Sequence, residues 1–324
     1  MEERELGRSG VAVSRVTLGC GNFGGVGSAP AFFGQGTPKD EAFRLMDAAW
    51  ELGIRTFDTA DAYGGGRSET FIGEWLTTKD GTVRDRIVLE TKTFNPMDTG
   101  HDHGLACARI HRQIDTSLRR LGVERVALYM AHAFDPDVSQ EETLLAFDEL
   151  ARAGKVGVVG ASNFTAEQLA EAVELSELEG LARYEWVQNS FSLLDQGDAE
   201  TVFPVCREHG LGYEAFGPLA GGWLTGKYRR GRPYPAGSRM TMRPEGYLDY
   251  ATDRVFDALE ALEQEAGARG VSMAGLALAW LLATPEVTAV IVGPGSVEQL
   301  EPVREALSLE LTPAERDHLR GLFE

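Results

Sequence analysis

Four polar residues, Asp58, Tyr63, Lys92 and His132, fall at the ends of three successive predicted strands. A tyrosine alone, with a pKa of about 10, holds its proton too tightly to be an efficient acid near pH 7. A neighbouring ammonium favours the phenolate and lowers that pKa, and a carboxylate keeps the ammonium charged and in place. An imidazole beside the same oxygen can orient a carbonyl or share the proton. Each residue alone is ordinarily a solvated or capping residue, but the combination predicts a site for proton transfer.

The overall composition narrows the kind of partner. The chain has 324 residues, of which 43% are hydrophobic, and a formal net charge of −19. That charge would repel nucleic acid phosphates, and the densest basic run, KYRRGR at residues 227–232, is short. The N-terminal MEERELGRSG has no apolar run of the signal-peptide kind, and the longest apolar stretch, at 274–283, is too short to cross a bilayer. We expect a cytoplasmic protein whose partner is a small molecule rather than a nucleic acid or a membrane.

The cysteines and histidines give no strong metal signal. Cys20, Cys107 and Cys206 are far apart and odd in number, which fits neither a disulfide framework nor a zinc site and suits a reducing cytosol. His101 and His103 form an H-x-H pair that could ligate a metal. They lie in a loop rich in Gly, Asp and Pro without a third ligand at recognisable spacing, which favours a solvated loop. We expect no metal site.

Short β-rich runs alternate with amphipathic helical segments almost from end to end. In the segment 39–52, for example, Phe43, Met46 and Trp50 fall on one helical face. The predicted strands are 16–19, 56–58, 87–92, 126–130, 156–161, 186–189, 211–215 and 289–292, with helices that include 39–52, 68–76, 105–121, 141–153 and 166–179. Eight strands, each followed by a helix, predict an α/β fold of the closed (β/α)8 TIM-barrel type, in one domain over residues 1–324.

Three further segments add to this barrel. Residues 21–38 after the first strand and 217–249 after the seventh form longer loops than a barrel requires, and such loops lie at the C-terminal face where the chemistry sits. GRSGVAVSRVTLG predicts a β-hairpin before the first strand. GCGNFG at 19–24 matches a dinucleotide-binding fingerprint, but no helix is plausible before Pro38. Its glycines therefore indicate a tight loop close to a ligand rather than a Rossmann fold.

Later strands end in residues that could contact a ligand. Ser162 and Asn163 could hold an amide such as a nicotinamide carboxamide, although Ser162 could equally lie near the next helix N-terminus. Gln188 could supply another amide contact. Phe216 could stack on a planar ring or simply pack in the core, and its spacing leaves both readings open.

The chain resembles the aldo-keto reductases over nearly its whole length. The blocks that carry the resemblance are GIRTFDTADAYGGGRSETFIGEWL, LGVERVALYMAH, GKVGVVGASNF, GPLAGGWLTGKY and VIVGPGSVEQL. It implies a barrel that binds an extended nicotinamide dinucleotide across its C-terminal face, and it places the family's catalytic tetrad on Asp58, Tyr63, Lys92 and His132. Tyr63 would be the general acid in reduction, with a pKa lowered by Lys92. Asp58 would anchor Lys92, and His132 would orient the carbonyl.

The same resemblance implies a set of cofactor contacts. Phe216 stands where a tyrosine or tryptophan usually stacks on the nicotinamide. The implied contacts are Gly19, Asp58, Ser162, Asn163, Gln188, Phe216, Gly217, Leu219, Gly222, Leu224, Lys227, Arg239, Gly293, Ser296 and Gln299.

Two departures from the family pattern bear on cofactor and substrate. Gly295 stands where members that select NADPH often carry an arginine for the 2′-phosphate. We expect NADP(H) to be favoured and NAD(H) to be possible, with Arg239 or Lys227 as sources of the missing charge. Gly21 removes a bulky wall common after the first strand. The aromatic residues that could restore an apolar wall or shape the pocket are Phe32, Phe33, Tyr247 and Tyr250.

Three functions remain in view. The first is an NAD(P)H-dependent oxidoreductase that reduces an aldehyde, ketone or sugar keto group to an alcohol, with Tyr63 as general acid. The second is an NAD-dependent sugar (aldose) dehydrogenase running the reverse reaction, which weak 2′-phosphate recognition would suit. The third is a nucleotide-binding regulatory subunit of a membrane channel, for which we would expect a basic or apolar docking surface.

Overall fold

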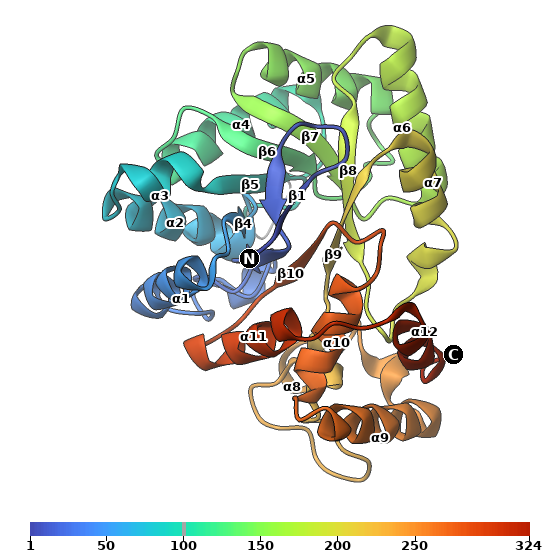
Figure 1. Cartoon of the computed structure of the whole chain (residues 1–324). Coiled ribbons are helices and arrows are strands. Elements are labelled where there is room, and N and C mark those ends of the chain that lie inside the picture. The colour runs from blue at the N-terminus through green and yellow to red at the C-terminus, as the bar shows by residue number, and fades with distance from the viewer. Residues whose placement is uncertain (99–101) are drawn as a thin grey trace.

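The computed structural model describes residues 1–98 and 102–324, and its strands close into the predicted barrel. Among these residues, eight parallel strands are joined in the order β10-β3-β4-β5-β6-β7-β8-β9 (Figure 1). They are β3 (Val16–Gly19), β4 (Thr56–Asp58), β5 (Val88–Thr93), β6 (Val126–Ala131), β7 (Val156–Ser162), β8 (Tyr184–Ser190), β9 (Gly212–Phe216) and β10 (Ala289–Val292). Parallel strands covered on both faces are buried throughout, which explains the unbroken apolar run VALYMA of β6.

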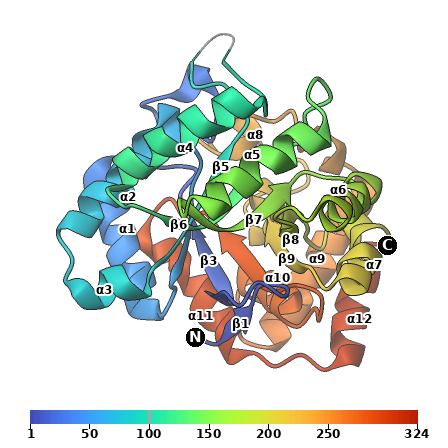
Figure 2. The same ribbon diagram turned by 90° about the horizontal axis from the view of Figure 1, so that it is seen from above.

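Helices surround the strands, as both views show (Figures 1 and 2). Their ends follow local sequence signals: α1 ends at Gly53, whose φ of 96° is left-handed, and α6 begins with a capping box of Thr165 and Gln168. The helices are α1 (Lys39–Leu52), α2 (Arg67–Thr77), α3 (Gly81–Arg86), α4 (Cys107–Leu121), α5 (Gln140–Arg152), α6 (Ala166–Glu179), α7 (Val202–His209), α8 (Arg239–Met242), α9 (Asp253–Ala268), α10 (Met273–Leu282), α11 (Glu301–Ser308) and α12 (Pro313–Gly321).

The predicted N-terminal hairpin forms and closes one end of the barrel. Strand β1 (Glu3–Glu5) pairs antiparallel with β2 (Ala12–Ser14). Leu6 and Val13, both fully buried, pack against apolar side chains inside the barrel. These are Leu128, Met130, Trp186 and Ala289. The hairpin therefore seals the N-terminal end of the barrel with an apolar plug.

Predicted element boundaries differ from the observed ones by a few residues. Strand β8 extends to Tyr184–Ser190, beyond the predicted 186–189, because neighbouring strands continue the hydrogen-bonded ladder. Helix α4 begins at Cys107 rather than at the predicted residue 105. The reason is a tertiary contact, since the Leu105 N–H donates to Asp135 Oδ2 at 2.7 Å.

Both predicted long loops are present at the C-terminal face. The first contains the 3₁₀ turn η1 (Pro30–Phe32) and no helix before α1, in agreement with the rejection of a Rossmann fold. It packs tightly on the turn after β4: a Cβ on Gly25 would lie 2.5 Å from the Gly64 Cα. The second loop contains η4 (Ala220–Thr225), α8 and η5 (Leu248–Tyr250). Arg243 Nη1 of the second loop donates to Val26 O of the first at 3.4 Å, so the two loops meet.

Candidate active site

The four predicted proton-transfer residues lie together at the C-terminal end of the strands. Asp58 ends β4, Lys92 lies one residue before the end of β5, and His132 directly follows β6. Tyr63 opens the short 3₁₀ turn η2 (Tyr63–Gly65) that follows β4. Parallel strands in a closed barrel all end at one face, so residues far apart in sequence converge there.

Lys92 and Asp58 form a buried ion pair. Lys92 Nζ donates to Asp58 Oδ1 and, at 2.9 Å, to the Thr59 carbonyl oxygen. The two side chains are only 0% and 5% exposed. Burial disfavours the ammonium, but Asp58, followed by Tyr63, raises the pKa of Lys92 above its ordinary value. Lys92 therefore stays charged at neutral pH, fixed beside the ring of Tyr63 at 5.1 Å from the ring centroid.

The Tyr63 hydroxyl lies 3.4 Å from His132 Nε2, and the two rings meet edge to face. The pKa of Tyr63 is raised to about 12, mainly by burial. The charge of Lys92 lowers this pKa, and the charge of Asp58 raises it. Lys92 lowers the pKa of Tyr63 as expected, but desolvation of the phenolate outweighs this attraction, so the net pKa is raised. Tyr63 keeps its proton throughout the neutral range, which is the state that a general acid needs.

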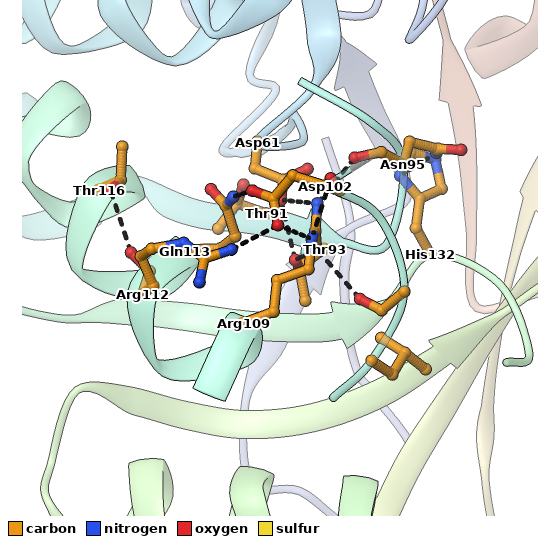
Figure 3. Close-up of polar contacts among 12 residues, drawn as sticks. Asp61, Thr91, Thr93, Asn95, Asp102, Arg109, Arg112, Gln113, Thr116 and His132 are labelled. Atoms are coloured by element: carbon orange, nitrogen blue, oxygen red, sulfur yellow. Dashed lines mark hydrogen bonds and ion pairs between the residues drawn. The ribbon is translucent and has the colours of Figure 1, made fainter. Parts of the chain in front are cut away.

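His132 is held from two sides. Its backbone N–H donates to Thr93 O at 2.9 Å, and its backbone carbonyl accepts from Asn163 Nδ2 at 2.9 Å. Its ring Nδ1 lies 3.0 Å from Asn95 Nδ2 (Figure 3). Burial, and then the charge of Lys92, lower the pKa of His132 well below its ordinary value, so the imidazole is neutral at pH 7.

Two carboxyl groups beneath the tetrad were missed in the sequence analysis. Glu90 of β5 and Glu214 of β9 are fully buried inside the barrel. Burial raises the pKa of Glu90 well above its usual range, and burial raises that of Glu214 to about 7. Gln188 Nε2 donates to Glu90 and, at 3.2 Å, to Asp58 Oδ1. The alternation of side chains along a strand could have identified Glu90, since it precedes Lys92 by two residues and therefore points to the same face of β5.

The polar side chains expected to hold a nicotinamide carboxamide point to different parts of the barrel. Ser162 is buried at the end of β7, and Asn163 adopts a left-handed φ of 58° directly after it. Asn163 Nδ2 donates to Ser162 Oγ at 3.0 Å, so these two lie at the barrel mouth beside His132. Gln188 instead directs its nitrogen inward to Asp58 and Glu90.

The loop after β9 contains most of the expected cofactor contacts. Phe216 ends β9, and Gly217 and Gly222 have φ of 65° and 100°. A Cβ on Gly222 would lie 2.1 Å from Lys227 Cε, so the Lys227 side chain occupies the space that a larger residue at position 222 would fill. Leu219 caps η4 and Leu224 is buried within it. Within residues 1–98 and 102–324, no carboxylate forms an ion pair with Lys227 or Arg239.

The segment after β10 carries the remaining expected contacts. Gly19, at the end of β3, lies beside β10, and Gly293 is exposed. Ser296 precedes the 3₁₀ turn η6 (Val297–Leu300), and Gln299 Oε1 accepts from the Gly295 N–H at 2.8 Å. Around Gly295, only the Gln299 side chain lies within 4 Å of an added Cβ. The space around Gly295, where NADPH-selecting members often carry an arginine, is therefore free of backbone and of other side chains.

Loop residues shape the mouth of the site. A Cβ on Gly21 would lie 3.5 Å from the Tyr63 ring, so Gly21 leaves room directly beside the phenol. Phe33 packs on Gly65, just after Tyr63, at 2.9 Å from the position of an added Cβ. Tyr247 covers Gly221 of η4 in the same way, at 2.7 Å. Phe33 of the first long loop thus lies next to the turn that carries Tyr63, whereas Tyr247 packs within the second long loop.

Comparison with known proteins shows which family this sequence resembles. The family model of the aldo/keto reductase family matches residues 15–324. The chain belongs to this family. A relative from Bacillus subtilis, the uncharacterized oxidoreductase YrpG, is 35% identical over 320 residues, covering 96% of this chain and 92% of that protein.

Other relatives of this aldo/keto reductase family member carry more specific names. Versiconal hemiacetal acetate reductase of Aspergillus parasiticus is 29% identical, over 98% of this chain and 96% of that protein. A probable voltage-gated potassium channel subunit beta of rice is 31% identical, over 100% of this chain and 97% of that protein. The family and its reductases support an oxidoreductase that acts on carbonyl compounds.

Two further findings bear on the expectations. No helix within residues 1–98 and 102–324 has both the length and the apolar character needed to cross a membrane. His101 of the H-x-H pair falls outside the described residues, and His103 lies near Phe94, with ring centroids 6.3 Å apart. The described cysteines are all free, with Cys20 and Cys206 buried.

Proposed function

We propose that this protein is an NAD(P)H-dependent reductase that converts an aldehyde, ketone or sugar keto group to an alcohol, with Tyr63 as the general acid. The observation that carries the proposal is the convergence at one barrel mouth of a protonated Tyr63, a charged Lys92 and a neutral His132. The ion pair with Asp58 holds Lys92 in place. The Tyr63 hydroxyl and His132 Nε2 are 3.4 Å apart, so a single carbonyl oxygen bound beside them could contact both groups.

Each side chain then has a defined part in the reaction. A reduced nicotinamide, when bound, supplies the hydride to the carbonyl carbon. Tyr63 donates its proton to the oxygen that becomes negative, and Lys92 stabilises the phenolate that remains. Asp58 keeps Lys92 charged and oriented. His132 binds the carbonyl oxygen and so fixes the substrate for transfer.

The residues present fit a dinucleotide. Phe216 offers an aromatic face at the end of β9, and Ser162 and Asn163 offer polar groups beside His132. Lys227 and Arg239 have no carboxylate partner among the described residues, in a chain whose net charge is −19. We favour NADP(H) on this basis, with NAD(H) as the alternative because Gly295 supplies no cation.

The first test combines cofactor binding with loss of the acid. Tyr63→Phe should bind the dinucleotide as tightly as the wild type, measured by fluorescence titration, but lose turnover by about 10²–10⁴-fold. Tyr184→Phe, the same chemical change at a buried tyrosine on β8, is the matched control and should keep turnover. Full activity of Tyr63→Phe on aldehydes and ketones would refute the assigned acid.

The second test separates reductase from sugar dehydrogenase. NADPH and NADH are titrated side by side at two salt concentrations. Binding of NADPH at least about tenfold tighter, or about 1.4 kcal/mol, would support the reductase assignment. Equal binding or a preference for NADH would favour an NAD-dependent aldose dehydrogenase, to be assayed with aldoses and NAD⁺.

The rice relative named as a potassium channel subunit keeps a regulatory role as a second candidate. In that case dinucleotide binding would serve as a signal, and hydride transfer would be slow or incidental. Turnover at rates typical of enzymes, about 1–10³ s⁻¹, with a simple carbonyl substrate would favour the reductase. Tight dinucleotide binding without turnover on a broad carbonyl panel would favour the regulatory role.

A further inference from the structure

We propose that Asn95 is a positioning residue that fixes which nitrogen of His132 carries the proton. Its amide N–H donates to His132 Nδ1, so the neutral imidazole carries its proton on Nε2, the nitrogen that faces Tyr63. This inference rests on the proposed reductase function for its consequence, but the protonation state itself can be measured without turnover.

The argument starts from the direction of one hydrogen bond. Asn95 Nδ2 lies 3.0 Å from His132 Nδ1, and an amide nitrogen can only donate. Nδ1 must therefore present its lone pair, which leaves the single proton of a neutral imidazole on Nε2. Burial and the charge of Lys92 lower the pKa of His132, which keeps the ring neutral and makes the choice of nitrogen matter.

Asn95 is itself held by a buried arginine. Arg109 Nη2 of α4 donates to the backbone carbonyl oxygen of Asn95 at 2.8 Å, and Arg109 Nη1 donates to Thr93 Oγ1 at 2.6 Å (Figure 3). Thr93 Oγ1 in turn donates to Asp61 Oδ2 at 2.8 Å, and that oxygen lies 3.6 Å from Arg109 Nη2. Arg109 is 3% exposed and Asp61 is fully buried. The chain segment that carries Asn95 is thus anchored to the end of β5.

The choice of nitrogen decides where the Tyr63 proton goes. With the proton on Nε2, His132 is a donor on the side of the ring that faces the Tyr63 hydroxyl, 3.4 Å away. A carbonyl oxygen bound between the two groups would then accept from both His132 and Tyr63. With the proton on Nδ1, Nε2 would instead accept the hydrogen bond of Tyr63 and compete with the substrate for its proton. Asn95 therefore directs the tyrosine proton to the carbonyl oxygen.

Any test by pH has to consider the ionisable groups around His132. They are Asp58 of β4, Asp61 and Tyr63 from the turn that follows it, Lys92 of β5, Asp102 of the loop before α4, and Arg109 in the first turn of α4. The nearest cation, Lys92, opposes protonation of the imidazole. A carboxylate placed at residue 95 would oppose that effect directly.

The decisive experiment is nitrogen NMR of the full-length protein with ¹⁵N-labelled histidine at pH 7.5. His132 is assigned by comparison with His132→Gln. We expect one protonated ring nitrogen, Nε2, and an unprotonated Nδ1. In Asn95→Leu we expect the two neutral forms to become mixed. A proton on Nδ1 in the wild type, or an unchanged single form in Asn95→Leu, would overturn the proposal.

Kinetics supply a second readout that a purely structural role would not produce. Asn95→Leu should lower kcat for carbonyl reduction by about 10- to 100-fold and leave dinucleotide affinity unchanged. Asn95→Asp should favour a proton on Nδ1 and raise the pKa of His132. Its activity should therefore recover as the pH falls through that pKa, where Nε2 regains a proton. An Asn95→Asp pH profile parallel to that of the wild type would contradict the assigned role.

A second cluster, on the outer surface of the barrel, carries an independent inference. We propose that Cys107 and His111 of α4, with Glu149 of α5, form a site for a thiophilic divalent cation such as Zn²⁺. Cys107 and His111 are one turn apart and so lie on the same helix face. The three ligand atoms lie within 4.8 Å of one another, and His111 Nε2 lies 2.8 Å from Glu149 Oε2.

The charges around this cluster suit a cation. The carboxylates of Glu142 and Glu149 both lie beside the N-terminal turn of α4, where the Cys107 N–H donates to Glu142 Oε1 at 2.9 Å. Among the described residues, Glu149 pairs only with His111 and with no lysine or arginine. Thiolate, imidazole and carboxylate are all ligands that Zn²⁺ accepts, water can occupy the fourth position, and the two negative ligands would neutralise the charge of the metal. Sequence spacing could not reveal this cluster, because Glu149 comes from the neighbouring helix.

Cobalt(II) tests this site, since it replaces Zn²⁺ and reports its ligands by absorbance. Titration of the reduced full-length protein should give a sulfur-to-cobalt charge-transfer band, displaced by added Zn²⁺. Cys107→Ser should abolish the band and His111→Gln should weaken binding at least about tenfold, whereas Cys206→Ser, at a buried cysteine, should leave both unchanged. No thiolate band in the wild type, or the same band in Cys107→Ser, would overturn the proposal.

Discussion

The N-terminal half of the barrel interior holds apolar side chains such as Leu128 and Trp186, which are covered by the N-terminal hairpin. The C-terminal half holds Lys92 and Asp58, with Glu90 and Glu214 below them. Both halves are equally buried, so burial alone does not determine polarity. The difference shows that the barrel is stabilised at one end by close apolar packing, while the other end accommodates buried charges that must be paired.

The largest expected effect comes from breaking the buried pair at the polar end. Lys92→Met removes the ammonium that would stabilise the Tyr63 phenolate in the proposed reaction, and kcat should fall by about 10²–10⁴-fold. It also leaves Asp58 buried without its partner, which should lower the free energy of unfolding by about 3–5 kcal/mol. Steady-state kinetics and urea unfolding measure the two effects.

The double variant Asp58→Asn with Lys92→Met separates those effects. It should recover much of the lost stability, because no lone charge remains, yet stay inactive. If Lys92→Met retained wild-type kcat, the polar end would not be a catalytic site at all.

The apolar end should respond in the opposite way. Leu128→Ala leaves a cavity beneath the hairpin and should lower the free energy of unfolding by about 2–5 kcal/mol. The kcat of the folded enzyme should stay within about twofold, since Leu128 belongs to the apolar cluster beneath the hairpin. A large loss of kcat at full folding would show that the two ends are coupled.

A smaller effect on stability is expected from Glu90 and Glu214, the two carboxyl groups that lie below the tetrad. Glu214 has a folded pKa of about 7, above its ordinary value of 4.5. The native state therefore binds a proton that the unfolded chain releases, so stability falls as the pH rises through that interval. Glu214→Gln should remove this slope and stabilise the protein at pH 8 by about 1–3 kcal/mol.

Thermal unfolding at pH 5 and pH 8 measures this change. Glu174→Gln, at an exposed position on α6, is the matched control and should show no altered pH dependence. A Glu214→Gln variant that is less stable than the wild type at pH 8 would mean that the carboxylate is paired rather than merely buried.

The smallest expected effect is that of pH on kcat, which should not change across the neutral to mildly alkaline range. Tyr63 must be protonated to act as an acid, and its pKa of about 12 keeps it so well above pH 8. The pKa of His132 is lowered, so that group stays neutral as well. The kcat for reduction should therefore be flat between about pH 7 and pH 9. An alkaline decline in this range that Tyr63→Phe lacks would show that a bound cofactor lowers the tyrosine pKa.

Local patterns were sufficient for the tetrad and the barrel. Strand-end residues in parallel strands share one face by necessity, so Asp58, Lys92 and His132 could be placed together before any contact was known. The hairpin and both long loops followed from turn residues and from the length of chain between apolar runs. Boundaries such as the start of α4 did not, because Asp135, distant in sequence, binds the N–H of Leu105.

The amino-acid sequence by itself determined the family, the (β/α)8 barrel and which residue types meet at its mouth, because periodicity and chain order fix which face each residue occupies. The tertiary structure alone decided the balance of forces on those residues. Burial, not the neighbouring ammonium, sets the net pKa shift of Tyr63, since desolvation depends on everything packed around the phenol. The contact of Asn95 with His132, and of Glu149 with His111, likewise join separate elements at distances that no spacing in the chain encodes.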